Sequence, residues 1–175
     1  MQPVFIPVSK RKSLRNLAGA ILLVVLGVLF IIKPYLFIKS DDPAVIRIIG
    51  YICVAFFGIC AIAIGRMLAN KKDGIWISHE GVNDQSSGIA AGKILWKDVK
   101  SIRVESVPGQ RFILLEVYNP EEYIRQQHNP LKKQAMGMNY QLYKTPVCIT
   151  ANFITIEFEK LLELLQAGFH QAERE

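Results

Sequence analysis

Two apolar runs lie close together near the N-terminus of this 175-residue chain, at 17–32 and at 44–64, the second with a single charge, Arg47, near its start. A helix of roughly 18 or more apolar residues can cross a hydrocarbon layer of ~30 Å. Two such runs joined by a short polar loop predict a transmembrane helical hairpin over 17–68, with spans of about 17–37 and 44–66. Residues 1–16 are then a basic cytoplasmic tail, and 74–175 form a separate domain.

The basic surplus of the chain belongs to the flanks of these runs. Residues 1–73 hold ten Lys and Arg against three Asp, a net charge of +7, whereas 74–175 hold eleven against twelve Asp and Glu, a net of −1. A nucleic-acid-binding domain carries its own basic footprint, so nucleic acid is excluded as a partner. Basic residues beside an apolar run instead control topology. The basic residues before the first run and after the second predict that both termini are cytoplasmic. These residues are Lys10, Arg11, Lys12, Arg15, Arg66, Lys71 and Lys72.

A basic stretch followed by an apolar run also begins a secretory signal peptide. Here the apolar pattern continues past Lys33-Pro34 to Ile38, no small-x-small cleavage site follows, and a second run comes directly after. The pattern therefore favours an uncleaved hairpin in a cell membrane. Ala61 and Gly65 form a small-xxx-small pair, which reflects either the ordinary composition of a span or packing within the hairpin.

After residue 73 the pattern becomes short and alternating, which predicts antiparallel strands. We expect a positive φ at Gly81, a corner at Lys97-Asp98 and a tight turn at Pro108-Gly109. A helical insertion over 119–145 begins at Asn119-Pro120 and restarts at Asn129-Pro130, and an amphipathic helix closes the chain at 159–170. The strands are predicted at 75–78, from 82, at 93–96, 99–107, 111–118, 146–150 and 153–158.

Two stretches carry a resemblance. Gly74-Ile-Trp-Ile-Ser-His-Glu-Gly-Val, followed by Ile94-Leu-Trp-Lys-Asp-Val-Lys-Ser-Ile, resembles the opening of bacterial pleckstrin-homology-like (PH-like) domains. The whole layout resembles a family of small, functionally uncharacterised bacterial membrane proteins with two N-terminal transmembrane helices and a cytoplasmic PH-like domain. The resemblance implies an α+β fold: the transmembrane hairpin, then a PH-like antiparallel β-barrel or sandwich with a C-terminal helix and a helical insertion before the last strands. It implies the bacterial inner membrane as the location, and no activity.

No catalytic, cofactor-binding or metal-binding residue is predicted, because catalysis needs titratable groups that converge. His79, His128 and His170 are expected on the surface, Trp96 in the core, and Asp98 as the cap of its corner. The three cysteines form no CxxC motif and no Cys/His cluster.

The insertion is the strongest functional candidate, since Arg125, Lys132, Lys133 and Lys144 are interleaved there with apolar residues. Short helices of this composition lie on anionic membranes; the alternatives are a lid with its charges in water and a site for a protein partner. We expect a non-enzymatic membrane protein whose PH-like module binds lipid headgroups or a protein. The alternative is an accessory subunit that joins a larger membrane complex through its hairpin.

Overall fold

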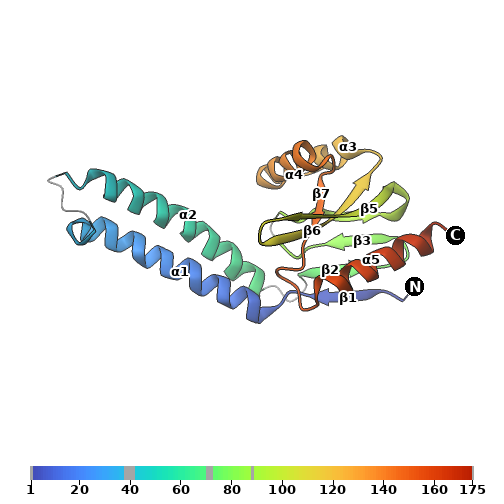
Figure 1. Cartoon of the computed structure of the whole chain (residues 1–175), viewed down its shortest axis with the longest axis horizontal. Coiled ribbons are helices and arrows are strands. Elements are labelled where there is room, and N and C mark those ends of the chain that lie inside the picture. The colour runs from blue at the N-terminus through green and yellow to red at the C-terminus, as the bar shows by residue number, and fades with distance from the viewer. Residues whose placement is uncertain (1, 38–41, 70–72, 88, 175) are drawn as a thin grey trace. The chain divides into compact units, whose positions relative to one another are not determined.

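The computed structural model describes residues 2–37, 42–69, 73–87 and 89–174, and the chain divides into two compact units (Figure 1). One unit is the helical hairpin, Lys10–Lys71. The other is assembled from both ends of the chain, Met1–Ser9 and Lys72–Glu175. The hairpin is therefore an insertion within the sheet-containing unit.

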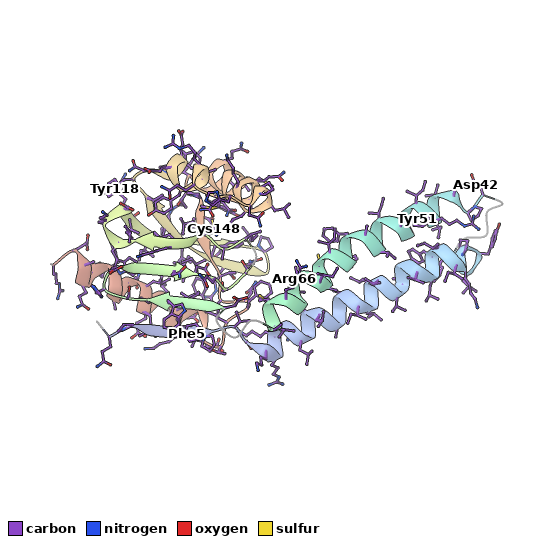
Figure 2. The ribbon with its side chains drawn as sticks, turned by 180° about the vertical axis from the view of Figure 1, so that it is seen from behind. Phe5, Asp42, Tyr51, Arg66, Tyr118 and Cys148 are labelled. Atoms are coloured by element: carbon purple, nitrogen blue, oxygen red, sulfur yellow. The ribbon has the colours of Figure 1, made fainter. Side chains whose placement is uncertain are left out.

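The hairpin consists of α1 (Lys10–Ile32) and α2 (Ala44–Ala69), both long and apolar enough to cross a membrane. Only 11% and 6% of their most apolar windows is buried, and Figure 2 shows their side chains pointing outward along both helices. A core helix of a soluble protein is mostly buried, so this exposure agrees with an apolar surrounding. The first helix is shorter at its C-terminus than the predicted span: it ends at Ile32, because Pro34 lacks the N–H that continues a helix, and Pro34–Leu36 is a 3₁₀ turn, η1.

The two helices approach each other most closely at Gly27 and Gly50. A Cβ on Gly50 would lie 2.7 Å from the Gly27 carbonyl oxygen, and one on Gly27 would lie 3.0 Å from the Gly50 oxygen. Only glycine permits backbones to come this near. The Ala61–Gly65 pair does not serve this role, since a Cβ on Gly65 would meet no atom within 4 Å.

The first sheet has the strand order β1-β2-β3-β4 and is antiparallel throughout: β1 (Val4–Pro7), β2 (Gly74–Ile77), β3 (Gly81–Asp84) and β4 (Gly92–Leu95). Strand β1 lies within residues 1–16, the segment predicted to be a basic tail, and α1 also begins within that segment, at Lys10. Four residues pair from Val4↔Ile77 to Pro7↔Gly74, and the rings of Phe5 and Trp76 stack with centroids 4.3 Å apart. Cross-strand aromatic pairs of this kind stabilise a sheet.

The second sheet has the order β5-β6-β7, formed by β5 (Val99–Val107), β6 (Gln110–Val117) and β7 (Val147–Ile149). The predicted corner is the 3₁₀ turn η2 (Trp96–Asp98), which leads from one sheet to the other. The predicted Pro108-Gly109 turn is confirmed, with φ of 80° at Gly109. Of the expected barrel or sandwich, the barrel is wrong: the described strands form two separate antiparallel sheets that are not closed into a barrel.

Gly81 is required because its neighbours leave no room for a Cβ, and not because its backbone adopts a positive φ. The described glycines with positive φ are Gly92 and Gly109, whereas a Cβ on Gly81 would collide with the carbonyl oxygen of Ile94 on the neighbouring strand. The predicted left-handed turn at Gly81 is therefore wrong, and the residue permits close pairing of β3 with β4 instead.

The strand predicted at 153–158 is also wrong. Only Ile154 forms a β-bridge there, opposite Val8, and α5 (Phe158–Ala172) begins at the end of the segment. The bridge is made by the Ser9 N–H donating to the Phe153 oxygen (2.6 Å) and the Thr155 N–H donating to the Pro7 oxygen (3.1 Å). Ile154 and Phe158 are still buried and Ile156 is half-buried, but the strand that would pair with this segment ends just before α1 begins.

Helix α5 covers the first sheet at the corner made by η2 (Figure 1). Trp96 is 3% exposed, as predicted for a core residue, and its Nε1–H donates to the Ser78 oxygen at 2.8 Å. Gly168 lets the helix come close, since a Cβ there would lie 2.7 Å from the Trp96 ring. Phe169 lies beside the same ring, with centroids 6.2 Å apart.

Candidate functional site

The insertion before β7 forms two helices, as predicted: α3 (Pro120–Arg125) and α4 (Pro130–Tyr143). Each begins with proline at its first position, where the missing N–H costs nothing. The Asn129 side chain caps α4 by accepting from the N–H groups of Leu131 (2.9 Å) and Lys132 (3.4 Å). Asn119 makes no such side-chain bond to α3.

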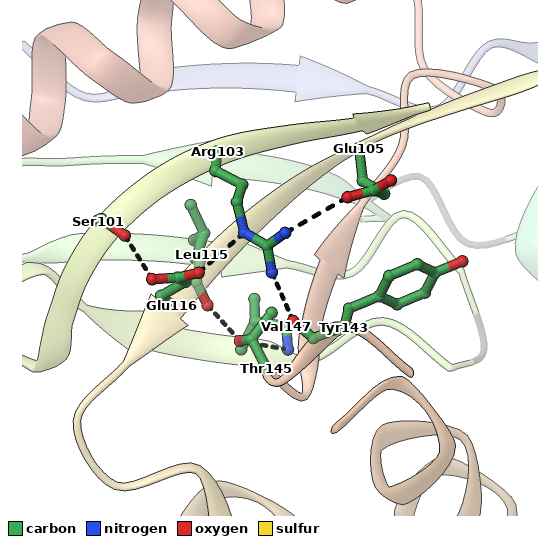
Figure 3. Close-up of polar contacts among 8 residues, drawn as sticks. All are labelled: Ser101, Arg103, Glu105, Leu115, Glu116, Tyr143, Thr145 and Val147. Atoms are coloured by element: carbon green, nitrogen blue, oxygen red, sulfur yellow. Dashed lines mark hydrogen bonds and ion pairs between the residues drawn. The ribbon is translucent and has the colours of Figure 1, made fainter. Parts of the chain in front are cut away.

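Arg103 of β5 holds the C-terminal end of α4 against the second sheet (Figure 3). One terminal N–H donates to the carbonyl oxygen of Tyr143, the last residue of α4, at 2.6 Å. Its Nε–H donates to Glu116 at 2.8 Å, and its other terminal N–H donates to Glu105 at 3.3 Å. A cation at a helix C-terminus also complements the helix dipole. We call this group the Arg103 clamp.

The chain leaves α4 through a second anchor. Lys144 adopts φ of 62°, a left-handed conformation that ends the helix, and its N–H donates to the Tyr140 oxygen. The buried Thr145 hydroxyl then donates to the Leu115 oxygen at 2.5 Å and accepts from the Val147 N–H at 3.3 Å. Both ends of α4 are therefore fixed.

Helix α3 is attached through Tyr123. The tyrosine hydroxyl donates to the Asp98 carboxylate at 2.7 Å and lies 3.5 Å from the Leu95 N–H, on the free edge of β4. Burial, together with the negative charge of Asp98, raises the pKa of Tyr123 well above its usual range. Asp98 therefore binds α3 and does not cap its own corner as predicted.

Lys132 is half-buried and reaches toward the interior of the domain. Its ammonium would lie 3.3 Å from a Cβ on Gly92, and it approaches the buried Asp84 closely enough to influence that carboxyl. Asp84 also accepts from the N–H (2.9 Å) and hydroxyl (2.6 Å) of Ser86. Burial raises the pKa of Asp84 and lowers the pKa of Lys132. This lysine is thus part of the packing beneath α4.

The outer side of α4 carries an apolar stripe, defined by Leu131, Met138 and Leu142. Their exposed fractions are 67%, 55% and 68%. The spacing of seven and four residues places them on one side of the helix, away from Met136, which is 1% exposed and faces the core. One side of the stripe is bordered by the exposed Gln134 and Gln141, and the other side by the half-buried Ala135 and Asn139.

The remaining basic residues of the insertion do not surround this stripe. Arg125, Lys133 and Lys144 are exposed, but Lys133 lies about 200° around the helix from Leu131. The four predicted basic residues thus divide between solvent and interior and do not form one basic apolar face. The residues predicted to control topology occupy the first turns of α1 and the last turn of α2, apart from Lys71 and Lys72, which lie outside the described residues.

The three histidines are exposed, as predicted, and come from separate elements. Sequence reasoning missed the Arg103 clamp, the Tyr123–Asp98 bond and the buried Asp84. The one available signal was the alternation of β5, which places Arg103 on the same face as Ser101 and Glu105. The α4 stripe offers apolar contact and amide hydrogen bonding, which are means of binding a partner.

The chain was compared with known proteins in three ways. No protein-family model, no curated protein and no solved structure matches it.

Proposed function

We propose that this chain is a membrane-anchored binding protein of the bacterial inner membrane. The hairpin crosses the bilayer twice, the sheet unit is a PH-like domain on the cytoplasmic side, and this domain binds a helix of a partner protein through the α4 stripe. The observation that carries the proposal is the stripe itself, because three large apolar side chains are exposed on a helix fixed at both ends.

Two features support the membrane topology. Strands β1 and β2 precede and follow the hairpin, and paired strands lie on the same side of a bilayer. The first turns of α1 hold Lys10, Arg11, Lys12 and Arg15, and no acidic residue. Cations at a helix N-terminus oppose the helix dipole, so helix stability does not account for them, whereas retention on the cytoplasmic side does.

The PH-like assignment is supported by the order of the elements. Two antiparallel sheets in sequence order, followed by a C-terminal helix packed over one end, agree with the layout that the sequence resemblance implies. Folds of this kind host many functions, so the activity is argued from the stripe and not from the fold.

The charge around the stripe favours a protein over an anionic headgroup. Headgroup binding by a helix uses Lys and Arg beside its apolar residues. Here one border of the stripe is Gln134 and Gln141, the other is Ala135 and Asn139, and Lys132 is turned inward. A narrow apolar seam with uncharged borders fits the packing of a second helix.

Site-specific photo-crosslinking of the full chain in its native membrane tests this proposal. The crosslinking residue is placed at Met138, on the stripe, and in a separate variant at Lys133, on the other side of α4. We expect a discrete protein adduct from position 138 that is absent from position 133 and is lost with Leu131→Gln and Leu142→Gln.

A phospholipid adduct from position 138 without a protein adduct would show that the stripe lies on the bilayer and would overturn the proposal. Equal protein adducts from both positions would also contradict it, because they would reflect random collision. Urea unfolding, monitored as described in the Discussion, verifies that the glutamine variants fold.

A second candidate function is assembly through the hairpin. Gly58 and Gly65 lie seven residues apart on α2, and a Cβ on either would meet no atom within 4 Å. They are therefore available to a helix of another membrane protein. Loss of a co-purified membrane protein with Gly58→Leu or Gly65→Leu, but not with the glutamine variants of α4, would favour this function.

A further inference from the structure

A cavity of about 680 Å³ lies at one end of the sheet unit, away from the α4 stripe. It opens beside the turn that joins β2 to β3, where His79 and Glu80 line it. Its volume is within the range of small-molecule sites. None of its lining residues belongs to the α4 stripe or to the Arg103 clamp.

One wall of the cavity is apolar and firmly positioned. It is formed by Trp96 of η2 and Phe169 of α5, with Leu95 at the end of β4. The hydrogen bond from the Trp96 indole to Ser78 and the close approach of Gly168 fix the indole ring. Trp96 is 3% and Phe169 9% exposed, so a ligand would meet the rims of these two rings together with Leu95, at positions that need no rearrangement.

The lining also contains three basic side chains, those of Lys93, Lys97 and Lys100. Lys93 is paired with Glu80 at 3.0 Å. Within the described part of the chain, neither Lys97 nor Lys100 forms an ion pair. The pKa of the nearby Glu116 carboxyl is lowered first by the Ser101 hydroxyl, and the charge of Lys100 adds to this effect.

A third side chain completes the site. Tyr118, labelled in Figure 2, is 63% exposed and lines the same cavity just after β6. Its hydroxyl adds a hydrogen-bond donor beside the lysines. The second acid of the lining, Glu173, lies 3.1 Å from the His170 ring nitrogen. Two ammonium groups thus remain for a ligand.

The cavity lies at the end of the sheet remote from the two connections to the hairpin. Those connections leave from Pro7 and Gly74, which are paired, whereas the cavity lies beyond Ile77, at the other end of β2. At ~3.3 Å per residue, the length of the strand separates the two ends by roughly 10 Å. This separation favours a ligand taken from solution.

We propose that the cavity binds a soluble organic phosphate. A phosphate monoester carries nearly two negative charges at neutral pH, which matches Lys97 and Lys100, whereas a carboxylate would match only one of them. The organic part of the ligand packs against the exposed ring of Tyr118 and against Leu95, beside the rims of Trp96 and Phe169. The chemical class is therefore a small phosphate ester with an aromatic or other apolar body.

Binding is measured with the full chain in nanodiscs of uncharged lipid. The Trp76→Phe variant leaves Trp96 as the only tryptophan, so its fluorescence reports on the cavity. Phenyl phosphate is the probe. Phenol keeps the aromatic ring without a charge, benzoate keeps the ring with a single negative charge, and inorganic phosphate keeps the charged group without the ring. Vesicles that contain a phosphorylated inositol lipid test a membrane source of the same phosphate group.

We expect saturable quenching by phenyl phosphate, at least tenfold weaker binding of benzoate, and a similar loss with Lys97→Gln plus Lys100→Gln. The matched control is Lys133→Gln plus Lys144→Gln, which removes the same charge from a different surface and leaves binding unchanged. Unchanged urea midpoints show that both pairs of variants fold.

Three results would each overturn the proposal. The first is no saturable quenching by phenyl phosphate up to about 10 mM. The second is equal weakening by the control pair, which would mean attraction by net charge alone. The third is binding of the inositol-lipid vesicles without binding of phenyl phosphate, which would identify a membrane ligand.

Discussion

Replacement of Arg103 by methionine tests whether the Arg103 clamp holds α4 in place. Methionine keeps much of the aliphatic length of arginine and removes its five donors. The variant leaves the Tyr143 carbonyl at the end of α4 without this donor, and it leaves Glu116 with only the Ser101 hydroxyl, at 2.8 Å. We expect the sheet unit to lose stability and the C-terminal turn of α4 to loosen.

The expected loss in the free energy of unfolding depends on how exposed the side chains of the Arg103 clamp are. Hydrogen bonds to charged groups contribute about 1.5–3 kcal/mol when buried, and exposed ion pairs about 0.2–1 kcal/mol. The Arg103 side chain is 40% exposed and that of Glu116 is 31% exposed, which places the group between these limits. Since the three hydrogen bonds that Arg103 donates are lost together, we expect roughly 2 kcal/mol. Arg103→Lys keeps the positive charge but not the planar guanidinium with its several donors. Its free energy of unfolding should therefore fall by about half as much as that of Arg103→Met.

Tryptophan fluorescence is a selective assay for this change. Both tryptophans of the chain, Trp76 and Trp96, lie in the sheet unit, so their signal follows that unit alone during urea unfolding in mild detergent. With a urea dependence of about 1–3 kcal/mol per molar, the midpoint should fall by roughly 1 M. Hydrogen exchange should accelerate at Tyr140 and Tyr143 more than in β2.

Arg111→Met is the matched control. Arg111 is on the neighbouring strand β6, pairs with Glu159 at 2.7 Å and lies over the Phe158 ring, but both partners of the ion pair are well exposed. Its removal should move the midpoint much less. If both methionine variants shift the midpoint equally, or if Arg103→Met shifts it by less than about 0.3 M, the reasoning from burial and geometry is refuted.

Three further predictions follow from single contacts. Gly50→Ala should destabilise the hairpin in detergent by about 1–3 kcal/mol, because the new methyl meets the Gly27 carbonyl, whereas Gly58→Ala should be tolerated; equal thermal midpoints would contradict this. The pKa of Glu116 is lowered from 4.5 by the Ser101 hydroxyl and then by Arg103, so its stabilising contribution is present above that pH and lost as the pH falls through the lowered value. Glu116→Gln should therefore flatten the fall of the urea midpoint below pH ~4.5, and an unchanged slope would refute the assignment. Burial raises the pKa of Cys148 to about 12, so in a variant with Cys53→Ala and Cys60→Ala the Cys148 thiol should react with iodoacetamide at pH 8 far more slowly in the folded protein than in urea, and similar rates would show that the thiol is open.

The local pattern of the chain predicts most of the elements. Alternation locates β5 with its observed bounds, proline after asparagine locates the starts of α3 and α4, and the apolar face of 159–170 predicts α5. These features are visible because each depends on residues within a few positions of one another.

Features that depend on distant partners were not predictable. Strand β1 is only four residues long and precedes a basic stretch, and its partner β2 comes almost seventy residues later. The alternating pattern at 153–158 predicts which side chains are buried, but a ladder needs a partner strand, and the partner here turns into α1.

The candidate site shows the same limit. Composition alone groups Lys132 with Lys133, yet adjacent residues on a helix point about 100° apart. Only the position of Met136 in the core decides that Lys132 points toward Asp84 and that Leu131 faces outward. The clamp joins Arg103 to Tyr143, about forty positions away, so the alternation of β5 shows on which face Arg103 lies but not that its partner is the end of α4.

The insertion of the hairpin between β1 and β2 has a consequence for how the protein is made. Residues 4–7 leave the ribosome before the hairpin, and they cannot pair with β2 until the hairpin and β2 have followed. If the hairpin inserts with its two ends on opposite sides of a bilayer, β1 and β2 can never meet. The sheet then ends on β2, and its unpaired edge invites aggregation. Completion of the sheet thus depends on correct insertion, and a fragment cut at residue 74 reproduces the misinserted state: any excised soluble form needs residues 1–9 joined back to the rest.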